Sequence, residues 1–213
     1  MKALVTGFEP FAGDGVNPSL EALHRLPGRS GAVDIATAAL PVAFGAALPT
    51  LRAAIARSRP DIVLSVGLAG GRAALSLERV AINVNDARIP DNDGSQPIDR
   101  PVVAGGPAAY FATLPIKAAA AALRQAGIPA AVSNSAGTFL CNHVFYGLMH
   151  EAARSGHAFR AGFLHVPYLP SQAAGEPGAP SMALAQIVEG IEIILQVAAA
   201  RTGDLAVSEG ALA

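Results

Sequence analysis

The residue with the clearest chemical potential in this chain is Cys141, its only cysteine. It lies in SNSAGTFLCNHVFYG (133–147), where a short apolar strand pattern ends and a helical pattern begins. Backbone N–H groups at a helix N-terminus carry partial positive charge, so a thiol there ionises more readily, and the thiolate is the reactive form. Free cysteine is also among the most buried residue types. Taken alone, Cys141 is therefore more typical of a core residue than of a nucleophile.

A cysteine nucleophile needs a base within hydrogen-bond reach, and the base needs an orienting partner. His165 is the candidate base, because it lies near the C-terminal end of the apolar run Arg160–Val166. A lone histidine in that place is more often a hydrogen-bonded structural residue. His143 competes for the role, but two residues after Cys141 on a helix it points to a different face.

Glu78 is the candidate orienting carboxylate. It lies on the otherwise apolar even face of the alternating segment Leu75–Val84, where an unpaired charge would be expensive to bury. The alternative is a structural role, in which Glu78 is an edge-strand residue or pairs with Arg79 or Arg88. Spacing alone does not separate the two interpretations.

The elements that must position these residues alternate between strand and helix. Strands are predicted at Lys2–Thr6, Val33–Leu40, Asp61–Val66, Leu75–Val84, Ala130–Asn134 and Arg160–Val166. Helices are predicted from Pro18 (N-cap Asn17) to about Leu26, over Phe44–Arg57 and Pro115–Gln125, from Cys141 to about Arg154, and after a Ser181 cap. The order predicts an α/β fold in which a mostly parallel or mixed sheet lies between helix layers.

Ligands of such sheets bind at the carboxyl ends of the strands. Four features are expected to meet there: the Phe8/Phe11 loop, the glycine-rich turn Gly67–Arg72, Cys141 and His165. This convergence favours the catalytic interpretation of Cys141 over the core interpretation.

Composition limits the partners. The 213 residues are 52% hydrophobic and 15% charged with a net charge of −1, which gives no electrostatic reason to expect nucleic acid or a membrane surface as partner. We expect one domain over residues 1–213, with a weakly ordered tail from 202 to 213. The low charge suggests that another subunit covers some apolar surface. One cysteine and the absence of a signal-peptide pattern predict a cytoplasmic protein without membrane spans.

Two further patterns look like cofactor motifs and fail on spacing. The glycine cluster Gly67–Gly71 lacks both the dinucleotide spacing and the phosphate-loop ending. The polar loop Asp86–Arg100 has several Asp residues but not the EF-hand order with its closing Glu. Its length indicates a functional loop. We expect no organic cofactor and no metal.

Three segments carry a family resemblance: VTGFEPFAGDGVNPS, ERVAINVNDARIPDNDGSQPID and SNSAGTFLCNHVFYGLMH. Together with GFLHVPYLP, they resemble the signature regions of pyroglutamyl peptidase I, also called pyrrolidone-carboxylate peptidase, from Leu4 to about Leu195. The resemblance implies a cytoplasmic thiol exopeptidase (an omega peptidase) that hydrolyses the amide bond after an N-terminal pyroglutamyl residue through a thioester acyl-enzyme. It also implies a three-layer α/β/α sandwich, commonly a homotetramer, that uses no cofactor.

Carried over by motif, Cys141 is the nucleophile, His165 the general base and Glu78 the orienting carboxylate. The Cys141 N–H and a group from the Arg88 segment are the candidate oxyanion donors. The resemblance implies a substrate pocket formed by Phe8, Phe11, Asn17, Ile89, Phe139 and Leu140. One departure is Leu68, where many relatives have Gln; it could alter affinity or selectivity.

Two other functions compete with the peptidase. A nucleoside phosphorylase-like activity would use a similar fold, but it requires a phosphate site of Arg, Ser and His, and the chain has no clear basic cluster. A ligand-binding or assembly protein without activity would be marked by a broken catalytic trio, whereas all three residues are present. Cleavage of a pyroglutamyl amide would separate the three.

Overall fold

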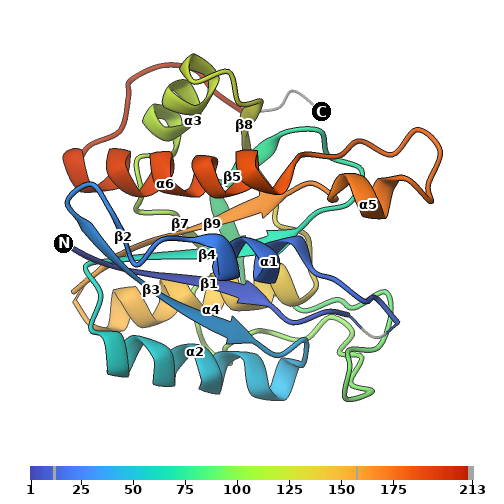
Figure 1. Cartoon of the computed structure of the whole chain (residues 1–213). Helices are drawn as coiled ribbons and strands as arrows, with labels where there is room; N and C mark the ends of the chain where they lie inside the picture. Colours follow the sequence, from blue (N-terminus) through green and yellow to red (C-terminus); the bar gives the residue numbers. More distant parts are fainter. Residues whose placement is uncertain (12, 157, 211–213) are drawn as a thin grey trace.

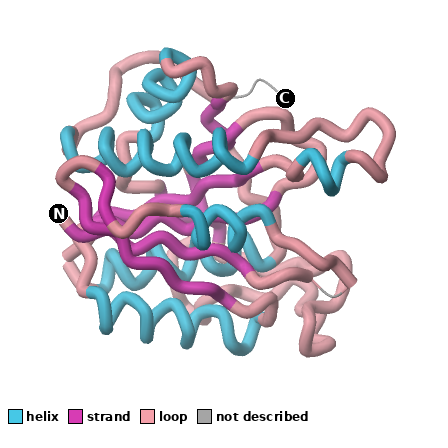
Figure 2. Tube along the Cα trace, in the orientation of Figure 1, coloured by secondary structure: helices cyan, strands magenta, loops and turns pink. Residues whose placement is uncertain are grey.

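A computed structural model describes residues 1–11, 13–156 and 158–210. Figure 1 shows a central twisted sheet with helices on both faces, and Figure 2 shows the same sheet as the middle layer. The seven strands are in the order β2-β3-β1-β4-β9-β5-β8, and a separate pair is formed by β6 and β7. The strands are β1 (Lys2–Phe8), β2 (Arg29–Ser30), β3 (Val33–Leu40), β4 (Ile62–Leu68), β5 (Leu75–Glu78), β6 (Val80–Ile82), β7 (Ala109–Phe111), β8 (Ala130–Ser133) and β9 (Arg160–Val166).

The sheet is mixed and mostly parallel, as predicted. β3, β1, β4 and β9 run parallel to one another, whereas β5 is antiparallel to β9 and β2 is antiparallel to β3. β9 lies between β4 and β5, and nearly all its residues are buried, which its apolar sequence on both faces predicts.

Helices cover the sheet on both sides, so the predicted three-layer α/β/α fold is confirmed. They are α1 (Pro18–Arg25), α2 (Phe44–Ser58), α3 (Ile116–Gln125), α4 (Leu140–Arg154), the short α5 (Pro170–Ala173) and α6 (Leu184–Ala200). α2 and α4 pack together on one face, and α6 packs against α1 and α3 on the other (Figure 1). Each face has its own apolar core cluster. Within the described residues, none of these helices combines the length and the apolar character needed to span a membrane.

Three predicted boundaries were wrong. The segment predicted as one strand over Leu75–Val84 divides at Arg79, because β5 pairs with β8 and β9 whereas β6 pairs with β7. Ser181 does not cap the last helix: it forms a bridge with Tyr168, and the helix begins three residues later. The sequence also predicts a flexible loop over Gln172–Pro180, but its first two residues belong to α5.

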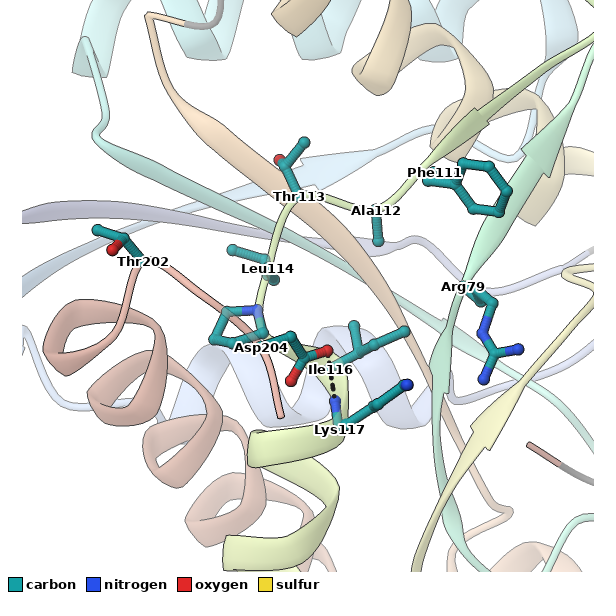
Figure 3. Close-up of a pocket in the computed structure, with 10 residues that line it drawn as sticks. Arg79, Phe111, Ala112, Thr113, Leu114, Ile116, Lys117, Thr202 and Asp204 are labelled. Carbon is teal, nitrogen blue, oxygen red and sulfur yellow. Dashed lines mark hydrogen bonds between the residues drawn. The ribbon is translucent and has the colours of Figure 1, made fainter. Parts of the chain in front are cut away.

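The C-terminal segment 202–210 has no regular secondary structure, but hydrogen bonds hold it against α3. The Asp204 carboxylate accepts hydrogen bonds from the backbone N–H groups of Lys117 and Ala118 in the first turn of α3, and Figure 3 shows the Lys117 contact beside a cavity of about 440 Å³. The Arg124 guanidinium pairs with Glu209. Weak order of the tail stays a prediction, and residues 211–213 lie outside the described part of the chain.

Candidate active site

Cys141 lies in the first turn of α4, as its sequence context predicts. The first intrahelical hydrogen bond of α4 runs from His143 N–H to Phe139 C=O, so the Cys141 N–H precedes it and remains available to a ligand. The thiol is partly exposed and lies directly over Gly67 near the end of β4. A Cβ at Gly67 would be 2.8 Å from Cys141 Sγ, so only glycine leaves space for the sulfur there.

Strand register brings His165 to the same point. In the parallel β4–β9 pair, Gly67 is opposite His165, and in the antiparallel β5–β9 pair Ser76 is opposite His165. Glu78 follows Ser76 by two residues and therefore shares its face of the sheet. His165 Nδ1 donates to Glu78 Oε1 at 2.7 Å, and both side chains are buried, with 5% and 0% exposure.

The charges around His165 decide its protonation. Burial by itself lowers the pKa of His165, but the Cys141 group beside it and the hydrogen bond to Glu78 raise it, and the net result is a pKa of about 9. Cys141 Sγ lies over Gly67, the register partner of His165, so the sulfur is next to the imidazole and raises its pKa. At neutral pH, His165 is therefore an imidazolium held between a carboxylate and the cysteine sulfur. The structure brings Cys141, His165 and Glu78 into one connected chain.

Glu78 has a second cationic partner that sequence reasoning missed. Arg72 Nη1 donates to Glu78 Oε1 at 2.8 Å. Sequence spacing suggests Arg79 or Arg88 as a partner of Glu78, but Arg79 instead donates to the Glu209 carbonyl oxygen. A signal for Arg72 was present, because it ends the glycine-rich turn and a buried carboxylate requires a cation nearby.

An apolar pocket of about 140 Å³ opens beside Cys141. Five residues expected at the substrate pocket line it together with the nucleophile: Phe8, Phe11, Asn17, Phe139 and Leu140. The wall is completed by Asp14, Val42 and Leu68, which sequence reasoning did not place in the pocket. Arg88, which is exposed, and Ile89 are not among the residues that line it.

Aromatic contacts and one cap fix the pocket wall. The Phe139 ring makes edge contacts with the rings of Phe11 and Phe44, at centroid distances of 6.2 and 5.4 Å. The Asn17 side chain accepts from Ser19 N–H as the predicted cap of α1 and donates to the Glu9 carbonyl. A small, apolar, preformed cavity beside a thiol suits a neutral ring joined to a reactive carbonyl.

Comparison with known proteins agrees with this geometry. The family model for pyroglutamyl peptidase matches residues 1–201. The chain belongs to the pyroglutamyl peptidase family. The chain is 56% identical to the pyrrolidone-carboxylate peptidase of Erwinia tasmaniensis over 211 residues, covering 99% of this chain and 98% of that protein. It is also 56% identical to pyrrolidone-carboxylate peptidase 1 of Ralstonia nicotianae over 210 residues, covering 98% of each chain.

Solved structures from the pyroglutamyl peptidase family share the whole fold. The crystal structure of pyroglutamyl peptidase I from Bacillus amyloliquefaciens superposes with a TM-score of 0.94 at 47% identity, covering 97% of this chain and 99% of that chain. A mutant (E192Q) pyrrolidone carboxyl peptidase from the hyperthermophile Pyrococcus furiosus gives 0.91 at 44% identity, covering 95% and 100%.

His143 occupies a different environment from the trio in this family member. Its Nδ1 pairs with Asn85 Oδ1 at 3.1 Å, and its ring lies edge-on to Phe44. Burial lowers the pKa of His143 to about 4, so it stays neutral. Its interactions hold α4 against Asn85 and against Phe44 at the start of α2 instead of activating Cys141.

Hydrogen bonds connect the loop 86–100 to the segment that carries the pocket residue Val42. The buried Asp91 carboxylate accepts hydrogen bonds from the N–H groups of Phe44, Asp93 and Ser95. The neighbouring Asn92 donates its N–H to the carbonyl of Val42, a pocket residue, and its side-chain amide to the Pro10 carbonyl. The several Asp residues of this loop lack the EF-hand order, and the Asp91 carboxylate organises backbone N–H groups.

Proposed function

We propose that this member of the pyroglutamyl peptidase family removes the N-terminal pyroglutamyl residue from peptides, with Cys141 as the nucleophile. The observation that carries the assignment is the connected chain from Cys141 through His165 to Glu78 beside an apolar pocket. The lactam ring is neutral and small, so it matches a cavity lined mainly by phenylalanine and aliphatic side chains.

Acylation uses Cys141 in its thiolate form with His165 protonated. The Cys141 thiolate attacks the pyroglutamyl carbonyl carbon, a C–S bond forms, and the oxyanion receives hydrogen bonds. The Cys141 N–H is one donor, and a group from the Arg88 segment is the proposed second. The C–N bond then breaks as the His165 imidazolium gives its proton to the leaving amine.

Deacylation regenerates the same groups. Neutral His165 takes a proton from water, and the resulting hydroxide attacks the thioester carbonyl. The C–S bond breaks, Cys141 leaves as thiolate, and His165 remains protonated. Glu78 holds Nδ1 throughout, so Nε2 stays directed at the reacting atoms. The sum is one peptide and one water converted to pyroglutamic acid and a shortened peptide.

The test is release of a fluorescent amine from a pyroglutamyl amide. We expect Cys141→Ala and His165→Ala to abolish turnover, and Glu78→Gln to reduce it while the fold is kept. Thiol alkylation should inactivate the unsubstituted chain, and substrate should protect it. Full activity in Cys141→Ala would overturn the mechanism. Phosphate-dependent cleavage of a nucleoside would favour the competing phosphorylase.

A matched control separates chemistry from packing. His143→Gln changes a histidine two residues from the nucleophile that pairs with Asn85 instead of Glu78. We expect this variant to retain most of its activity per folded molecule, whereas His165→Gln should not. Equal losses in both would mean that the trio has no special role.

Location and assembly complete the proposal. We place the enzyme in the cytoplasm, since a single cysteine that must stay reduced suits that compartment. We also propose self-assembly, as a tetramer by family resemblance. Support comes from the exposed Phe111 ring, which is 70% accessible in the isolated chain. Light scattering on the purified protein and fractionation of cells test the two points; a concentration-independent monomer would refute assembly.

A further inference from the structure

Arg72 is the strongest feature that the assigned chemistry leaves unexplained. It ends the turn Gly67–Arg72, whose sequence lacks the spacing of a nucleotide-binding loop. Its Nη1 donates to Glu78 Oε1 at 2.8 Å, and its Nη2 donates to the Ser135 carbonyl at 3.2 Å. One guanidinium therefore joins the carboxylate of the trio to the loop that precedes Cys141.

The turn is built to hold this guanidinium in place. Ala69 N–H bonds the Val166 carbonyl at the end of β9, and Arg72 N–H bonds the Ala69 carbonyl. A Cβ at Gly70 would lie 2.4 Å from the Tyr168 hydroxyl, so the loop after His165 packs directly on the turn. The Arg72 side chain starts from a backbone fixed to the strand that carries the base.

The charge balance at Glu78 requires a permanent cation. Glu78 is fully buried, and both His165 and Arg72 donate to Oε1, while Oε2 has no hydrogen-bond partner within the described residues. During turnover, His165 gives up its proton and becomes neutral, so for that interval it no longer compensates the carboxylate. A buried carboxylate without a cation is strongly disfavoured, whereas arginine never loses its charge.

We infer that Arg72 is a positioning residue of the reaction, which keeps Glu78 ionised and aimed at His165 while the imidazole is neutral. The inference rests on the proposed function. Its consequence is specific to one step. Acylation starts from the imidazolium, which itself compensates Glu78. Deacylation starts from neutral His165, so loss of Arg72 slows the attack of water on the thioester more than the formation of the thioester.

The experiment uses an activated pyroglutamyl aryl ester, with which acylation is fast. The burst of phenol counts competent sites, and the following steady rate reports deacylation. We expect Arg72→Ala to keep a burst and to lower the steady rate per titrated site by about 10- to 100-fold. Arg72→Lys retains the charge but not the second donor to Ser135, so its loss should be smaller.

A merely structural role gives a different pattern, because misfolding lowers the burst and the steady rate together. Arg79→Gln is the matched control: Arg79 adjoins Glu78 in sequence, but its guanidinium binds the Glu209 carbonyl and lines the cavity in Figure 3. We expect its rate per site to be unchanged. The alkaline limb of the pH profile should also move upward in Arg72→Ala. Glu78, Cys141 and Arg72 are the charged groups observed around the imidazole, and Arg72 is the cation among them, bound to the same carboxylate oxygen as His165, so its charge opposes the proton.

A steady rate per titrated site in Arg72→Ala within about twofold of the unsubstituted chain would overturn the inference. If Arg72→Ala does not fold, Arg72→Gln, which removes the charge but keeps a polar side chain, decides it by the same ratio, and equality with the unsubstituted chain again refutes the role. Failure of the proposed function is distinguishable, because it would appear as turnover in Cys141→Ala.

Discussion

Substitution of Gly67 by alanine tests whether the close contact between β4 and the Cys141 sulfur is needed for activity. The added Cβ would lie 2.8 Å from Cys141 Sγ and 2.9 Å from Phe163 Cζ. Carbon atoms pack at about 3.5–4.0 Å, and sulfur is larger, so the two neighbours must move away by roughly 0.7 Å or more. Phe163 is held in the core, where it packs against Phe145. The Cys141 thiol is partly exposed, so it is the group that moves away from the added Cβ.

The size of the effect follows from that displacement. A shift of about 1 Å in a reacting group costs on the order of 100-fold in rate, equivalent to about 2.7 kcal/mol of activation free energy. Overpacking should lower the free energy of unfolding by about 1–3 kcal/mol. Gly67→Ala should therefore stay folded at moderate temperature while losing most of its activity.

The assay measures release of the fluorescent amine together with thermal unfolding, and alkylation counts accessible thiols. Gly45→Ala is the matched control, because Gly45 is exposed in α2 and a Cβ there meets nothing within 4 Å. Helix propensity predicts equal or slightly higher stability for it and unchanged activity. If Gly67→Ala keeps activity within about threefold of the unsubstituted chain, the placement of Cys141 over Gly67 is not the productive one.

Further predictions concern pH and the loop behind the pocket. Because the pKa of His165 in the folded protein is about 9 instead of 6.5, kcat/KM should fall on the alkaline side near pH 9. In Glu78→Gln this alkaline limb should move toward pH 6.5. A limb that does not move would contradict the pairing of His165 with Glu78. Because its pKa is raised in the folded state, protonated His165 also stabilises the fold. This contribution to the free energy of unfolding is complete below pH 6.5 and is lost as pH rises through 9. Denaturant unfolding of the unsubstituted chain and of His165→Gln across this pH range would measure it. Asp91→Ala should lower the free energy of unfolding by about 1–3 kcal/mol and raise KM, because three N–H groups lose their acceptor. Asp93 is exposed, so Asp93→Ala should change the free energy of unfolding by less than about 0.5 kcal/mol. Equal effects of the two substitutions would refute the role of Asp91 in holding the loop.

Local patterns were enough for most elements. The strands Val33–Leu40 and Arg160–Val166 were predicted with the bounds that the structure has, because apolar runs between polar turns depend only on nearby residues. The division at Arg79 could not be predicted, since alternation continues through it and only pairing with β7 separates β6 from β5. Ser181 had the right residue type for a cap, but its bridge to Tyr168 determined where α6 begins.

For the site, sequence by itself determined the chemical types: one thiol at a helix start, one imidazole at a strand end, and one carboxylate on an apolar face. Tertiary structure decided which of them meet. Strand order put β9 between β4 and β5, and that register joins residues 87 positions apart into the Glu78–His165 pair. It also decided that Arg72, not Arg79 or Arg88, compensates Glu78, because the direction of a side chain from a turn depends on what packs against the turn. Residue type is a local property, whereas charge compensation depends on distances that only the folded chain defines.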